Sequence, residues 1–89
     1  MEKRIITFNA VVETEVKIEK ELELTSEELD DLLINSTSYD EKTGMIEVDE
    51  VTEESSYELN EMLLGIVPDE LKKNCVSMTF TDIRVIRQK

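Results

Sequence analysis

Histidine is absent from the 89 residues of the chain, and this absence excludes several kinds of active site. Histidine is the common general base, the usual partner of a serine or cysteine nucleophile and a frequent zinc ligand. The single cysteine, Cys75, cannot form a disulfide within the chain, and its only basic neighbours in sequence are Lys72 and Lys73. We interpret Cys75 as a small buried hydrophobic residue, and we expect a cytoplasmic protein that is not an enzyme.

Glycine and long apolar runs are also scarce. The two glycines, Gly44 and Gly65, lie far apart, so no glycine-rich loop is available to cradle a phosphate. No stretch approaches the roughly 18 apolar residues of a membrane span, and the first residues lack the apolar run of a signal peptide. Clustered lysines and arginines, which carry direct nucleic-acid binding, are missing as well. The sequence therefore predicts no membrane or direct nucleic-acid contact and no cofactor or metal ion.

Negative charge dominates what is present. The chain has 22 acidic and 10 basic residues and a net charge of −12. Residues 13–61 alone hold 18 acidic and 3 basic residues, a net charge of −15. Self-repulsion on this scale destabilises a compact state. Two interpretations remain open, namely that the charge keeps the protein soluble or that it forms a surface for a basic partner.

Alternation of apolar and charged residues over residues 8–24 is the strongest structural signal in the sequence. The even positions are mostly apolar or neutral: Phe8, Ala10, Val12, Thr14, Val16, Ile18, Lys20, Leu22 and Leu24. From residue 13 on, the odd positions are all charged: Glu13, Glu15, Lys17, Glu19, Glu21 and Glu23. A period of two predicts a strand with one row on the core and the other in solvent. Because neither glycine nor proline interrupts the pattern, we predict one continuous strand of roughly 55 Å.

Two helices are predicted from their caps and apolar stripes. Thr25 begins a Thr-Ser-Glu-Glu capping box ahead of a helix over residues 26–35. Ser55 has a glutamate at the same spacing ahead of a second helix, which we predict to end at Gly65. One or two further helical turns are expected to begin at Pro68.

Turn signals divide the remaining residues into short strands. A polar run that ends in Gly44 predicts a hairpin pairing residues 37–40 with residues 45–51, with Gly44 at positive φ. The spacing of acidic residues in this run does not fit a calcium-binding EF-hand loop. A last strand is expected from Val76, and its apolar positions change parity, which predicts a bulge near residues 81–83.

These elements predict an α+β fold in a single domain over residues 1–89. We expect a mainly antiparallel sheet of three to four strands, with a very long first strand and two main helices packed on one face.

The charged row of the first strand and the first helix predict a partner-binding surface. Neighbouring acidic residues of such a row lie about 6.6–7 Å apart, close to the phosphate spacing along a nucleic-acid strand. In size, acidity and lack of catalytic groups the chain resembles the small acidic inhibitors of phages and mobile elements, including anti-CRISPR proteins and DNA mimics. The expected function is that of an acidic non-enzymatic protein that inhibits or regulates a basic partner, for example a nucleic-acid-binding protein. The expected contact residues are Glu13, Glu15, Glu19, Glu21, Glu23, Glu27, Asp30 and Asp31.

Two alternatives remain open at this point. An assembly or accessory subunit would oligomerise, for example as a homodimer, through the exposed edge of the long strand. A small-molecule or metal-binding module would instead change its thermal stability when a ligand or Ca²⁺ is added.

Overall fold

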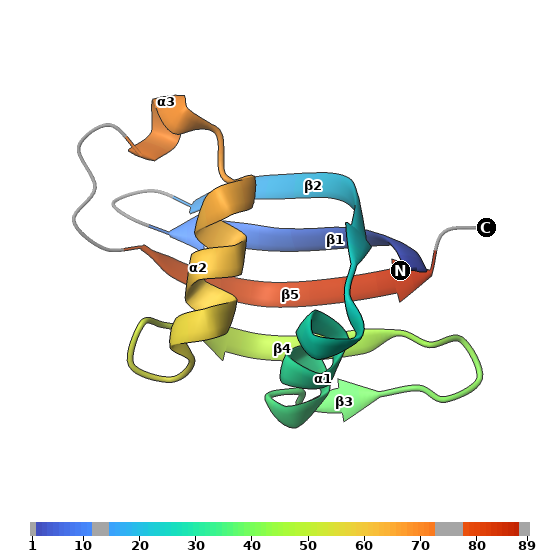
Figure 1. Cartoon of the computed structure of the whole chain (residues 1–89). Helices are drawn as coiled ribbons and strands as arrows, with labels where there is room; N and C mark the ends of the chain where they lie inside the picture. The colour runs from blue at the N-terminus through green and yellow to red at the C-terminus, as the bar shows by residue number, and fades with distance from the viewer. Residues whose placement is uncertain (1, 12–14, 73–77, 88–89) are drawn as a thin grey trace.

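Five strands form one antiparallel sheet in the order β2-β1-β5-β4-β3 (Figure 1). The computed structural model describes residues 2–11, 15–72 and 78–87. The strands are β1 (Glu2–Val11), β2 (Glu15–Leu24), β3 (Ser38–Tyr39), β4 (Ile46–Val51) and β5 (Thr79–Arg87). The helices are α1 (Ser26–Ile34), α2 (Tyr57–Ile66) and α3 (Asp69–Lys72). The α+β fold with an antiparallel sheet is confirmed, whereas the expected three to four strands were too few.

The predicted continuous strand over residues 8–24 is wrong, because this stretch contains the end of β1 and all of β2, which pair antiparallel. Val11 pairs with Glu15, so the chain reverses direction between them. Only three residues separate this pair, and an odd number keeps even positions on the same face in both strands. Phe8 therefore pairs with Ile18 on the core side, and the alternation passes through the reversal without a change of phase.

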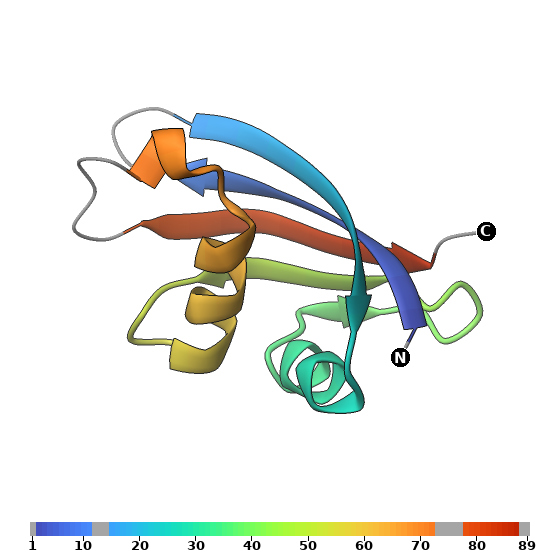
Figure 2. The ribbon, with the colours of Figure 1, turned by 45° about the horizontal axis from the view of Figure 1, so that its top comes forward.

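Helices α1 and α2 cover one face of the sheet and leave the other face open (Figures 1 and 2). Leu32 of α1 and Leu59 and Leu63 of α2 are fully buried and belong to the same apolar cluster as the even-numbered residues of β1. Under them, the rings of Phe8 and Phe80 meet edge to face, with centroids 5.4 Å apart and planes at 83°. We call the uncovered side, which carries the odd-numbered residues of β1 and β2, the open face.

The start of α1 confirms the predicted capping box. The Thr25 side chain accepts a hydrogen bond of 3.2 Å from the backbone N–H of Glu28. The Glu28 carboxylate in turn accepts one of 2.9 Å from the backbone N–H of Thr25. These two bonds satisfy donors that a helix start otherwise leaves unpaired.

Both predicted ends of α2 need correction. Ser56 caps the helix by accepting from the N–H of Leu59, whereas Ser55 exchanges hydrogen bonds of 2.8 and 3.1 Å with Thr52. The helix also continues through Gly65 and ends two residues before Pro68. Proline forces the residue before it into an extended conformation, so Pro68 rather than the glycine stops the helix.

Gly44 takes a φ of +76° in the β3–β4 connection, as its sequence context predicts. Its N–H donates to the carbonyl of Asp40 at 2.7 Å, and its carbonyl accepts from the buried Arg4 side chain at 3.2 Å. The predicted hairpin is confirmed, although β3 is only two residues long.

A bulge in β5 confirms the predicted irregularity near residues 81–83. Thr7 pairs with Arg84, but the next pair along β1 joins Asn9 to Thr81, so β5 has one extra residue. Asp82 lies in this bulge with a φ of +50°. The interpretation of Cys75, by contrast, concerns a residue outside the described ranges.

Candidate binding surface

Four glutamates of β2 point out from the open face at the edge of the sheet. Glu15, Glu19, Glu21 and Glu23 are all exposed, and we call them the β2 acidic row. Their orientation follows from the strand alternation, because Ile18 and Leu22 on the other side pack against the core. Lys17 lies in the same row and is also exposed, while the predicted contact residue Glu13 falls outside the described residues.

The β2 acidic row is not neutralised by neighbouring side chains. None of its four carboxylates lies within 4.0 Å of a cationic group among the described residues, although Lys3 of β1 is the cross-strand neighbour of Glu23. Ion pairs do form elsewhere in the described chain, where Arg84 lies 3.7 Å from Glu47 and Lys72 lies 3.3 Å from Asp69. The row is therefore open to an external cation.

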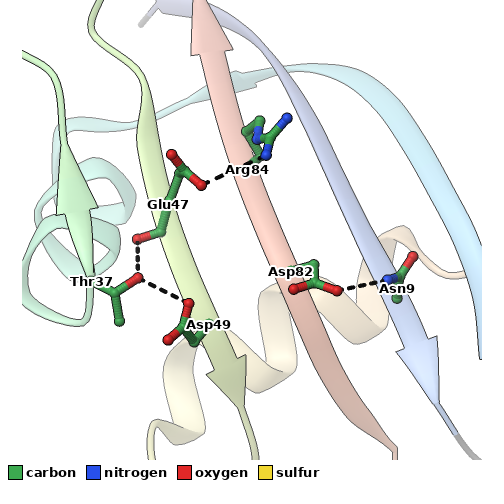
Figure 3. Close-up of polar contacts among 6 residues, drawn as sticks. All are labelled: Asn9, Thr37, Glu47, Asp49, Asp82 and Arg84. Atoms are coloured by element: carbon green, nitrogen blue, oxygen red, sulfur yellow. Dashed lines mark hydrogen bonds and ion pairs between the residues drawn. The ribbon is translucent and has the colours of Figure 1, made fainter.

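Acidic residues of β4, which lie on the open face away from β2, form an ion pair and a hydrogen bond with other side chains of the protein. Glu47 of β4 pairs with Arg84, and Asp49 accepts a hydrogen bond of 3.3 Å from the hydroxyl of Thr37 (Figure 3). Charge on the open face is thus partly compensated along β4 and β5, whereas the carboxylates along β2 are left in solvent.

A shallow groove of about 870 Å³ lies on the open face between β2 and β5. It is lined by Thr7, Asn9, Glu15, Lys17, Glu19, Asp82, Arg84 and Ile86. The β5 bulge contributes Asp82 to its lining, and the Asp82 carboxylate accepts a hydrogen bond of 3.2 Å from the side chain of Asn9 (Figure 3). Two members of the β2 acidic row form one wall of this groove.

The predicted contact residues of α1 do not share a face with the β2 acidic row. Glu27 and Asp30 are exposed and Asp31 is half-buried on a helix whose Leu32 is buried in the core. Since α1 packs against the covered face of the sheet, these acids lie in the helix layer (Figure 2). The single surface predicted from the sequence is therefore divided between the two sides of the sheet.

The outer edge of β2 has no neighbouring strand among the described residues. On its core-side face, Val16, Ile18 and Leu22 are only half-buried, because the edge strand is incompletely covered. Lys20 interrupts this apolar row and is exposed. A charged residue on the apolar side of an edge strand is a common device against unwanted strand pairing.

Sequence reasoning missed the residues that β1 and β5 contribute to the groove. The parity change near residue 82 located the bulge, but it did not indicate which strand lies beside it. Asn9 and Asp82, whose side chains meet, are 73 positions apart. No local pattern connects residues at that separation, so the signal for this part of the site is lacking in a single sequence.

Within the described ranges, no group of three or more cysteine, aspartate or glutamate side chains is arranged to hold a metal ion. The described helices are too short or too polar for any of them to cross a bilayer. The comparisons with protein-family models, curated proteins and solved structures found no match to the chain.

Proposed function

We propose that this chain is a small, acidic, non-enzymatic binding protein of the cytoplasm that inhibits or regulates a basic partner protein. The β2 acidic row and the adjoining groove are the contact surface in this proposal. A nucleic-acid-binding protein is the class of partner that fits best, because its basic groove normally faces a regular line of negative charge.

The observation that carries the proposal is the exposed and uncompensated state of the β2 acidic row. Carboxylates that only keep a protein soluble need no particular order, whereas these four lie along one strand on a sheet face that none of the described helices covers. With four carboxylates and one lysine, this row is net negative, and a net negative surface raises the local concentration of a cationic partner and accelerates its association. The acids of α1 lie on the other side and contribute to the long-range field in this proposal.

The test is charge reversal of part of the row. Replacing Glu15, Glu19 and Glu21 by lysine removes the negative wall and changes the net charge from −12 to about −6. We expect the variant to keep its fold, because all three side chains are exposed, and to lose the proteins that the parent chain captures from its host at 150 mM salt.

A matched control separates the row from net charge. Glu41, Glu53 and Glu61 are also exposed, and they lie outside β2. Their replacement by lysine produces the same net charge, and this variant should retain the captured partner. Equal loss of the partner by both variants would contradict a role for the row, and so would retention by both.

Self-assembly through the edge of β2 is a second candidate function. It is favoured because β2 is ten residues long and is the last strand at one end of the sheet order. Among the described strands, β2 pairs only with β1, so its outer backbone edge is available to a second copy. Light scattering separates the two candidates, because a salt-resistant dimer supports self-assembly and a monomer at micromolar concentration argues against it.

A further inference from the structure

We propose that the basic partner binds by adding an extended segment to the edge of β2 as a sixth strand. In this arrangement lysines or arginines of the segment lie on the open face, and apolar residues alternate with them on the helix side. The inference rests on the proposed function, because it states the form in which the basic partner would meet the β2 acidic row.

The backbone of β2 supplies the first requirement for strand addition. β2 is ten residues long and pairs only with β1 in the described part of the chain, whereas the strand at the opposite edge, β3, has two residues. In an antiparallel pair every second residue directs its N–H and C=O away from its partner strand. About five residues of β2 therefore present both groups to an incoming segment.

The two side-chain rows of β2 supply the second requirement, since each one selects a different kind of residue. The β2 acidic row on the open face favours cationic side chains in the cross-strand positions. On the other face, the half-buried Val16, Ile18 and Leu22 gain cover from apolar side chains. A segment that alternates basic and apolar residues satisfies both rows at once.

A second copy of the chain fits this edge poorly. When β2 pairs antiparallel with itself about a twofold axis, positions of equal parity face each other, so the two acidic rows meet. The register that sets Lys17 opposite a glutamate at position 19 also sets Glu15 opposite Glu21. In the same register Lys20 faces an apolar residue, Val16. Charge complementarity therefore favours a basic segment over self-pairing.

Short peptides test the inference on the wild-type protein. The first peptide has nine residues in which five lysines alternate with four valines, and the second has the same residues as a lysine block followed by a valine block. Fluorescence anisotropy at 150 mM NaCl should show about tenfold tighter binding of the alternating peptide, the order expected when several cross-strand pairs form in one register. Amide exchange in β2 should slow at alternate residues when this peptide is bound.

Backbone methylation of the alternating peptide gives a sharper control. In an added antiparallel strand, the N–H groups that face β2 all belong to residues of one parity. Methylating every valine nitrogen or every lysine nitrogen should therefore abolish binding in only one of the two peptides.

Any of four results would overturn strand addition. Equal binding of the alternating and block peptides, or full retention of binding after both methylations, would mean that charge alone attracts the ligand, and the proposed function would survive. Absence of binding by every peptide would also reject the inference. The proposed function is tested separately, by comparing how much partner protein the two charge-reversal variants capture. A protein that is already dimeric, with β2 amides protected before any peptide is added, would assign the edge to a second copy.

Discussion

Replacing Gly44 by alanine should destabilise the fold through the backbone rather than through a lost contact. The residue has a φ of +76°, a conformation that costs an L-amino acid with a side chain about 1–2 kcal/mol. Alanine also restricts the unfolded chain, which offsets about 0.4–1 kcal/mol of this cost. The net expectation is a loss of about 1 kcal/mol in unfolding free energy, or about 4–8 °C in Tm for a domain of this size.

The turn has little freedom to relax this strain. The N–H of Gly44 donates to Asp40 at 2.7 Å, and its carbonyl accepts from the buried Arg4 at 3.2 Å. A Cβ at this position would also lie 2.5 Å from Nε of Arg87. Because Arg87 is an exposed and flexible side chain at the end of β5, we expect it to move aside at small cost.

Urea unfolding followed by circular dichroism checks the prediction with two comparisons. Gly44→Asn carries the same Cβ but tolerates positive φ better, so it should lose less stability than Gly44→Ala. Gly44→Ala in an Arg87→Ala background should lower the free energy of unfolding as much as it does in the parent, because the contact with Arg87 is not the cause of the destabilisation. An alanine variant as stable as the parent, or a full rescue by Arg87→Ala, would refute the backbone explanation.

Three further predictions concern a cap, the edge strand and the acidic row. Thr25→Ala should cost about 1 kcal/mol of unfolding free energy in a urea titration, since it removes one half of the capping box, and Thr25→Ser should retain most of it. Lys20→Ile should make the apolar row of β2 continuous and so promote self-association, which size-exclusion chromatography detects. Lys20→Arg keeps the charge and should elute at the same volume as the parent. Replacing Glu15, Glu19 and Glu21 by glutamine should weaken binding of a basic peptide about twentyfold at 150 mM salt. This value assumes three contacts at about 4 Å in water, each worth about 0.6 kcal/mol after screening, and the loss should shrink in 1 M salt.

The elements set by local chemistry were predictable from the sequence. The capping box at Thr25, the positive φ of Gly44 and the bulge at Asp82 each depend on a few adjacent residues, and each is present. The predicted end of α2 at Gly65 is wrong, because glycine is tolerated within a helix at moderate cost. Proline three residues after Gly65 imposes the stronger constraint.

The continuous strand over residues 8–24 was wrongly predicted, because the alternation of apolar and charged residues stays the same where the chain reverses direction. Residues 12–14 keep the parity of the alternation, and they include neither of the residue types that usually mark a turn. The outward direction of Glu15 to Glu23 could still be predicted, since a period of two holds on either side of the reversal. That β2 becomes an edge strand depends on β5 pairing with β1, a contact between distant parts of the chain.

The position of the α1 acids shows the same limit. Glu27, Asp30 and Asp31 follow closely after the β2 acidic row in the sequence, which predicts that they extend the same surface. Because α1 packs on the covered face of the sheet and buries Leu32, these acids lie on the opposite side from the β2 acidic row despite their proximity in sequence. The face on which a helix packs is decided by tertiary contacts that its own residues do not specify.

Chemical-shift mapping by NMR shows directly whether a basic segment binds along β2. The ¹⁵N-labelled chain would be titrated with the alternating basic peptide, and the shift changes of backbone amides would be compared between the two faces of the sheet. The proposal predicts that the largest changes fall on the backbone amides of β2, with smaller changes on its neighbour β1 and the smallest in α1 and α2. Changes centred on Glu27, Asp30 and Asp31 of α1, or spread evenly over all acidic residues, would contradict it.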